Sequence, residues 1–186
     1  MGTASDIAGS RGALPIPPPP ASLAGKRGII VGIANDASIA WGCAKAMHAC
    51  GAELALSYLN DKAKPYVEPL AQSAGAPIFM PCNVENPGEL EALFEAAAQC
   101  WGSIDFLVHS IAFAPYPELQ GRVIDCSRDG FLRAMDISCH SFLRMARLAE
   151  PLMTHGGCML TMSYLGADEV IEGYDMMGPV KAHRSP

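Results

Sequence analysis

Residues 26–42 read KRGIIVGIANDASIAWG and contain the first two elements of the fold. The run Lys26–Gly32 is apolar and ends in a glycine, which predicts a short buried strand. The segment Ser38–Cys50 has helical character, and Gly51 behind it provides a helix stop. The stretch therefore predicts a strand, a glycine turn and a helix in succession, which is the repeating unit of an α/β fold.

The same alternation continues to residue 163. Further strands are predicted at 53–58, 77–82, 104–110 and 157–163, and further helices at 62–74, 87–100 and 127–153. In the third helix, Asn86, Pro87 and Glu89 read as N-cap, first helical residue and capping carboxylate. Strands joined by helices of this length form right-handed crossovers, and near-continuous apolar strands are typical of a sheet covered on both faces. We therefore predict an α/β protein with a Rossmann-like, doubly wound parallel sheet.

The composition is that of one folded domain and excludes several kinds of partner. The chain has 186 residues, of which 50% are apolar and 17% charged, and its net charge of −6 argues against nucleic acid. No apolar run is long enough to span a bilayer, and the N-terminus lacks the pattern of a signal peptide. The seven cysteines have no Cys-x-x-Cys spacing, so neither a disulfide framework nor a zinc site is indicated. We therefore expect a cytoplasmic protein with no metal, membrane or nucleic-acid partner.

The N-terminal segment differs from the rest of the chain. Residues 1–22 are small, polar and rich in proline, so we expect a disordered tail there and a folded domain over 23–186.

A doubly wound parallel sheet binds its ligand at the carboxyl ends of its strands. The loops that follow the predicted strands and meet at that edge are 32–42, 58–61, 82–86, 109–115 and 163–181. In the first loop, Gly32 allows a tight turn, and Ser38 with the helix N-terminal amides would suit a pyrophosphate. The usual G-x-G-x-x-G is absent, so an ordinary strand–helix turn with a serine N-cap explains the same residues equally well.

The last of these loops contains Tyr164, Tyr174 and Lys181. Tyr174 and Lys181 are seven positions apart, so on a continuous helix they would lie on nearly one face, two turns apart. That arrangement predicts a phenol and an ammonium around one small site. Taken singly, each residue has a simpler interpretation, because a tyrosine at a strand end is more often a packing residue and a lone lysine is usually solvated.

Five ordered motifs give the chain a specific resemblance. They are Gly32–Gly42, His109–Pro115, Asp136–Ser138, Ser163–Ala167 and Tyr174–Ala182. Together they resemble the NADH-dependent enoyl-[acyl-carrier-protein] reductases of bacterial fatty-acid synthesis, a divergent group of short-chain dehydrogenases/reductases, over residues 24–182. Ordinary members of the wider family carry Tyr-x3-Lys, whereas here Gly178 occupies the lysine position and the lysine follows at 181.

The resemblance implies that a trans-2-enoyl thioester, carried by acyl carrier protein, is reduced with NADH as cofactor. It assigns Tyr174 to stabilising the enolate oxygen, Tyr164 to the acyl pocket and proton delivery, and Lys181 to the cofactor ribose. The implied cofactor-binding residues are Gly32, Ser38, Ile39, Asn83, Val84, Ser110, Ile111 and Lys181. The implied substrate-binding residues are Ala114, Tyr164 and Tyr174.

Several side chains keep a plain structural interpretation beside the functional one. His109 lies in an apolar strand and is expected to be a structural histidine. Met176 and Met177 are interpreted as core residues, with an acyl pocket as the alternative. Four arginines recur at helical spacing on the 127–153 helix and indicate a solvated face, with carrier-protein docking as the alternative; they are Arg128, Arg133, Arg144 and Arg147.

The chain also departs from the family pattern. Asn83 replaces an aspartate but its amide oxygen still accepts a hydrogen bond, and no arginine follows the second strand to bind a ribose 2′-phosphate, which favours NADH over NADPH. Beyond Ala182 the sequence no longer matches, whereas the family continues with two more strands and a substrate-covering helix. We therefore expect an incomplete reductase domain, truncated at its C-terminus. The family forms homotetramers that pack partly through the unmatched region, which leaves the assembly of this chain open.

Two alternatives to an active reductase follow. The first alternative is an inactive NAD-binding fragment of such an enzyme. The second is another short-chain dehydrogenase/reductase, such as a ketoreductase. The missing Tyr-x3-Lys disfavours the second alternative.

Overall fold

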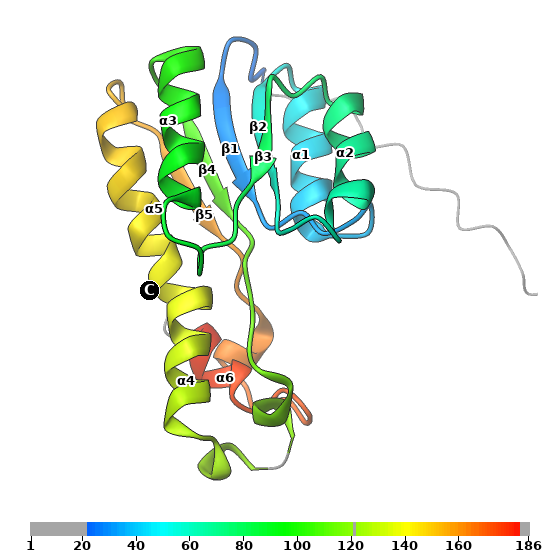
Figure 1. The fold of residues 1–186 in the computed structure, drawn as a ribbon, viewed down its shortest axis with the longest axis vertical. Helices are drawn as coiled ribbons and strands as arrows, with labels where there is room; N and C mark the ends of the chain where they lie inside the picture. Colours follow the sequence, from blue (N-terminus) through cyan, green and yellow to red (C-terminus); the bar gives the residue numbers. More distant parts are fainter. Residues whose placement is uncertain (1–21, 121, 183–186) are drawn as a thin grey trace, which may run out of the picture.

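The computed structural model describes residues 22–120 and 122–182 and contains one parallel five-stranded sheet (Figure 1). Its strands are β1 (Arg27–Val31), β2 (Glu53–Tyr58), β3 (Ile78–Pro81), β4 (Phe106–His109) and β5 (Cys158–Thr161). Their order is β3-β2-β1-β4-β5, and every neighbouring pair is parallel. The predicted doubly wound sheet is thereby confirmed, while the predicted tail, except for Ser22, lies outside the described residues.

Helices cover both faces of the sheet, as Figure 1 shows. One face packs against α1 (Ile39–Ala49) and α2 (Lys64–Ser73), and the other against α3 (Glu89–Trp101) and α5 (Ser141–Ala149). Within β1, Ile29 and Val31 join the core under α3 and α5, whereas Ile30 joins the core under α1 and α2. The strands read as continuous apolar runs because successive side chains enter different cores.

The start of α3 differs from the prediction. Gly88 has a φ of 87°, which is left-handed, so Pro87 precedes the helix and α3 begins at Glu89. The Glu89 carboxylate accepts hydrogen bonds from the Asn83 amide N–H at 2.7 Å and from Asn86 Nδ2 at 2.7 Å. Glu89 therefore ties the helix to the loop that follows β3.

The predicted helix at 127–153 is interrupted. Its parts are α4 (Arg128–Met135), a π-helical turn at Asp136–His140, α5, and a 3₁₀ turn at Glu150–Leu152. The Ser141 hydroxyl donates to the Ile137 carbonyl at 2.6 Å, and the Ser141 amide N–H bonds the Asp136 carbonyl instead. The backbone ladder thus shifts by one residue at this point, and the hydroxyl bonds the carbonyl that the Ser141 amide would use in an α-helix.

The same serine contacts His109, whose side chain is fully buried. His109 Nε2 lies 2.7 Å from Ser141 Oγ, and Nδ1 lies 3.1 Å from Thr161 Oγ1. Because the single hydroxyl proton of Ser141 goes to Ile137, Nε2 must carry the hydrogen and donate to Ser141. His109 thus links β4, β5 and the π-helical turn, in line with the structural role expected for it.

A smaller group of elements lies beyond the carboxyl edge of the sheet (Figure 1). It comprises α4, α6 (Met177–Ala182) and 3₁₀ turns at Tyr116–Leu119, Val123–Asp125 and Leu165–Ala167. Its core is formed by Ala114, Ala134, Met176, Met177 and Val180. At one end of the strand order, Met159 and Leu160 of β5 are each 42% exposed, so this strand is an exposed apolar edge of the sheet.

Asp105 joins the starts of β1 and β4. Its carboxylate accepts hydrogen bonds from Lys26 Nζ at 2.7 Å and from the Arg27 amide N–H at 2.9 Å. Burial raises the pKa of Asp105, but the hydrogen bonds from Lys26 and Arg27 lower it by a larger amount. The net pKa therefore lies below the usual value of 3.8. The folded state therefore holds the charged form more strongly than the unfolded state does.

We predict that Asp105→Asn lowers the free energy of unfolding by about 1 kcal/mol at neutral pH, because charge-assisted bonds are lost. Because folding lowers the pKa of this carboxyl, its contribution to stability is complete above the pKa of the unfolded state. The contribution is lost as the pH falls through the pKa of the folded state. The difference from wild type should therefore shrink as the pH drops below 3.8. Urea unfolding followed by circular dichroism at a series of pH values measures it, and a difference that stays constant into strong acid would contradict the assignment.

We predict that Ser141→Ala lowers the free energy of unfolding by about 1–3 kcal/mol, because the buried Nε2–H of His109 loses its acceptor. The matched control is Ser73→Ala, since the Ser73 hydroxyl also bonds a backbone carbonyl but is exposed. Its effect should stay within about 0.5 kcal/mol. Equal losses in the two variants, measured by urea unfolding, would show that the His109 contact adds nothing.

Candidate active site

The loops after β1, β2, β3 and β4 enclose a crevice of about 410 Å³ at the carboxyl edge of the sheet. Among the residues predicted to bind a cofactor, Gly32, Asn83, Val84, Ser110 and Ile111 line it. Leu59, Cys82 and Phe113 also line it; they belong to the loops predicted to meet there but were not assigned to the cofactor, and Ser57 was not predicted at all. The structure therefore brings together residues from four separate loops, as the parallel sheet predicts.

Gly32 brings the loops after β1 and β4 into contact. Its φ is 103°, and a Cβ at this position would lie 2.1 Å from the Ser110 carbonyl oxygen. The Ser110 amide N–H in turn donates to the Val31 carbonyl at 3.0 Å. Only glycine fits this close approach, so this side of the crevice is built from backbone atoms.

Ser38 and Ile39 stand at the N-terminus of α1 and do not line the crevice. The Ser38 hydroxyl accepts hydrogen bonds from the Ala34 and Asn35 amides, both at 3.3 Å, and donates to the Asn35 carbonyl. It makes no capping bond to the helix, although Ser38 is the N-cap residue. The serine therefore shapes the loop, and the first-turn amides of α1 have no capping side chain.

Cys82 forms part of the apolar wall of the crevice. Burial, followed by the negative charge of Glu89, raises the pKa of the Cys82 thiol to about 12. The thiol therefore stays protonated near neutral pH and acts as a small apolar side chain.

The two tyrosines of the C-terminal motifs pack against each other. The ring centroids of Tyr164 and Tyr174 are 4.7 Å apart, and the planes are tilted by 52°. A Cβ on Gly166 would lie 2.4 Å from the Tyr174 ring, so the glycine makes room for it. A hollow of about 570 Å³ borders Tyr174 and runs along the loop 166–175, and it shares no lining residue with the crevice.

Lys181 is buried on α6, with 5% of its surface exposed. Its Nζ donates to the Met162 carbonyl at 2.9 Å. Met162 directly follows β5, and its amide N–H donates to the His109 carbonyl at 3.0 Å. The ammonium therefore lies at the same edge of the sheet as Ser110 and the crevice.

The prediction that Tyr174 and Lys181 share one helix face is wrong. The helix α6 begins at Met177, so Tyr174 precedes it. Gly173 and Asp175 have φ values of 71° and 41°, and these left-handed residues on either side of Tyr174 form a turn. The turn directs Tyr174 toward Tyr164, while α6 carries Lys181 alone.

Ala114, predicted to contact substrate, is 9% exposed and packs in the core with Met176 and Met177. These two methionines are 1% and 7% exposed, which fits their interpretation as core residues rather than pocket lining. Ala114 thus lies against the segment that follows Tyr174.

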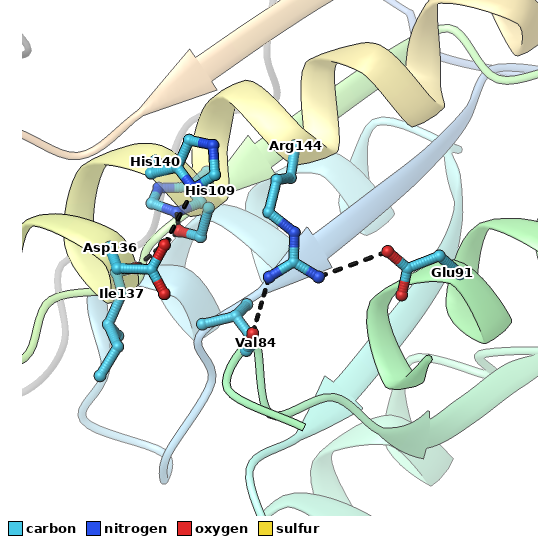
Figure 2. A network of polar contacts seen from close by, with 8 residues as sticks. Val84, Glu91, His109, Asp136, Ile137, His140 and Arg144 are labelled. Carbon is cyan, nitrogen blue, oxygen red and sulfur yellow. Dashed lines mark hydrogen bonds and ion pairs between the residues drawn. The ribbon is translucent and has the colours of Figure 1, made fainter. Parts of the chain in front are cut away.

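Three polar residues of the α4–α5 helix support the crevice and were not predicted to do so. The Ser138 hydroxyl accepts from the Phe113 amide at 2.8 Å and donates to the Phe113 carbonyl at 2.9 Å. Arg133 and Arg144 contact the loop after β3 (Figure 2 shows Arg144). The solvated-face interpretation is therefore wrong for Arg144, whose side chain is 29% exposed, whereas Arg133 is 53% exposed and binds Glu85 at the surface. Helical spacing was the available signal, but it does not reveal partners on other elements.

Comparisons with known proteins agree with one another. The family model described as enoyl-(acyl carrier protein) reductase matches residues 32–184. An NADH enoyl-[acyl-carrier-protein] reductase of Rhizobium meliloti is 49% identical over 85% of this chain and 58% of its own length. A reductase of the same name from Nostoc is 42% identical over 87% of this chain and 64% of its own length.

Solved structures give the same result. The enoyl-(acyl-carrier-protein) reductase of Anaplasma phagocytophilum, in complex with NAD, has a TM-score of 0.83 and 49% identity, over 88% of this chain and 63% of that one. The Bacillus cereus reductase, with NADP⁺ and an indole naphthyridinone, has a TM-score of 0.83 and 41% identity, over 88% and 64%. The chain thus spans about three fifths of the length of these relatives. Among residues 22–120 and 122–182, no helix has the length and apolar character needed to cross a membrane.

The family model covers residues 32–184, and the Rhizobium meliloti relative is 49% identical over 85% of the chain. The chain belongs to the enoyl-[acyl-carrier-protein] reductase family.

Proposed function

We propose that this chain carries the active-site groups for the NADH-dependent reduction of a trans-2-enoyl thioester on acyl carrier protein. The observation that carries the proposal is the packing of Tyr164 and Tyr174 near the sheet edge to which Lys181 is anchored. The family membership and the crevice at the same edge support it. The family also supports the cytoplasm as the place of action.

The lining of the crevice has the chemistry that a dinucleotide requires. The turn at Gly32 and the uncapped amides of α1 suit a pyrophosphate, and the apolar wall at Val84 suits an adenine ring. Ser110 and Ile111 would hold the nicotinamide half, and Lys181 the ribose. NADH, when bound, supplies the hydride.

The second-strand loop favours NADH over NADPH. Leu59 and Asn60 line the crevice there, and neither provides a positive charge for a 2′-phosphate. Lys64, the first residue of α2, does not line the crevice; its Nζ lies over the Tyr58 ring, 5.8 Å from the ring centroid. A 2′-phosphate would therefore meet no cation among the residues that line the crevice.

In the proposed reaction, negative charge develops on the thioester oxygen as the β-carbon is reduced. The Tyr174 hydroxyl donates a hydrogen bond to that oxygen, which lowers the energy of the charged species. The buried ammonium of Lys181 adds positive potential on the same side. Tyr164, which is 50% exposed, lines the acyl pocket and takes part in proton delivery to the α-carbon.

A second candidate is nucleotide binding without turnover. It is favoured by the separation of the two hollows, since the space beside Tyr174 shares no lining residue with the crevice. Binding and turnover must therefore be measured separately, with NADH fluorescence for the first and loss of NADH absorbance with a crotonyl thioester for the second. Binding without turnover by the wild-type chain would favour this second candidate, and absence of both would exclude the proposal.

We predict that Tyr174→Phe lowers turnover of the crotonyl thioester about 10²–10³-fold, because one donor to the developing oxyanion is lost. The dissociation constant of NADH should stay unchanged, since the phenol does not line the crevice. The control is Tyr66→Phe, which removes a hydroxyl from a side chain that is 66% exposed on α2 and should leave both quantities unchanged. Undiminished turnover in Tyr174→Phe, with normal NADH binding, would refute the role of Tyr174.

A further inference from the structure

We propose that Arg144, supported by Arg133, is a positioning residue that holds the adenosine side of the crevice in place. It does so by fixing the loop that follows β3, residues 82–86, which forms one wall of the crevice. The inference rests on the proposed binding of NADH.

Arg144 contacts this wall at Val84 and also contacts Glu91 of α3, as Figure 2 shows. Its Nη1 donates to the Val84 carbonyl at 2.8 Å, and its Nη2 lies 3.3 Å from Glu91 Oε1 on α3. The arginine side chain is only 29% exposed. A charged donor to a backbone carbonyl in this setting contributes more than a bond between two exposed side chains.

The wall needs such a support because space lies on both sides of it. Val84 and Glu85 line the crevice, and they also line a second hollow of about 430 Å³ on the side of Arg144. Glu89 bonds Asn83 and Asn86 of this loop, but these bonds do not reach Val84, which lies between the two residues. Arg144 also lines the second hollow, and its hydrogen bond fixes the Val84 carbonyl.

Glu91 keeps Arg144 oriented toward Val84. Glu91 lies in the first turn of α3, where backbone N–H groups lower the pKa of its carboxyl, and Arg144 lowers it further. Glu91 is therefore charged near neutral pH. The guanidinium thus bridges α3 and the β3 loop with two different nitrogen atoms.

Arg133 contributes a weaker second contact. Its Nε and Nη2 bind the Glu85 carboxylate at 2.7 and 3.0 Å, and its guanidinium lies 4.9 Å from the centroid of the Phe113 ring. Glu85 and Phe113 come from different walls of the crevice, so Arg133 joins the two walls. The side chains of Arg133 and Glu85 are 53% and 34% exposed, and exposed pairs of this kind contribute little.

The chain offers a matched control on the same helix. Arg147 is exposed on α5 and makes no hydrogen bond or ion pair within residues 22–120 and 122–182 that reaches the crevice loops. A substitution there removes the same charge from the same helix but leaves the wall untouched.

The test compares NADH with reduced nicotinamide mononucleotide, which lacks the adenosine half. Arg144→Met should raise the dissociation constant of NADH about tenfold, as expected for the loss of one charge-assisted hydrogen bond. The dissociation constant of the mononucleotide should not change. Arg133→Met should weaken NADH binding only about two- to fourfold, and Arg147→Met should leave it unchanged. Both ligands are titrated by their fluorescence, with thermal melting as the check on folding.

Arg144→Lys provides a second variant in case the methionine variant does not fold. A lysine keeps the charge but reaches only one of the two partners. The NADH affinity of Arg144→Lys should therefore be lower than that of wild type and higher than that of Arg144→Met. An unchanged NADH affinity in both variants overturns the inference, and so does an equal loss for NADH and the mononucleotide, which would mean a general loss of structure. If the wild-type chain binds no NADH, the proposed function itself fails, and the inference fails with it.

Discussion

The parallel register of three neighbouring strands determines where the functional groups of this chain lie. Val31 pairs with His109, and His109 pairs with Thr161, so the residues that follow these strands emerge side by side. Each parallel step requires a crossover helix, and each helix buries its apolar stripe on the sheet. Both faces are thereby occupied, and the carboxyl edge is where loops from all the strands can meet around a ligand. The crevice is therefore a consequence of the strand order.

The same edge contains polar groups whose burial must be compensated. His109, Ser138 and Ser141 are each at most 1% exposed, and every one has hydrogen-bonding partners. Their bonds run from β4 and the β4 loop to the π-helical turn, so the turn holds the sheet and the loop at once. Ser141 connects the two features, because its hydroxyl donates to the Ile137 carbonyl within the turn and lies 2.7 Å from His109 Nε2.

Much of the fold could be predicted from the sequence because strands and helices have local periodicities, and β2 has the predicted bounds, Glu53–Tyr58. The crevice loops followed from the sheet, and the resemblance named residues such as Gly32 and Val84. Features that depend on distant partners could not be predicted. The π-helical turn is followed by Ser141, which contacts His109 at a distance of 32 residues along the chain. Arg144 and Arg133 bind partners 60 and 48 residues away, and on their own helix they look solvated. The turn at Tyr174 was missed because Asp175 gives only a weak signal for a left-handed conformation.

The charges around the crevice indicate how an acidic chain with a net charge of −6 would accept an anionic dinucleotide. Arg133 and Arg144 are each paired with a glutamate, so they add little net positive potential. No lysine or arginine is among the described residues that line the crevice. Attraction for a pyrophosphate would then come from the uncapped backbone amides at the start of α1, where the helix dipole is positive. Such amides act only at short range and with correct orientation. Such a site depends on loops that keep a fixed position, which is the role that we propose for Arg144.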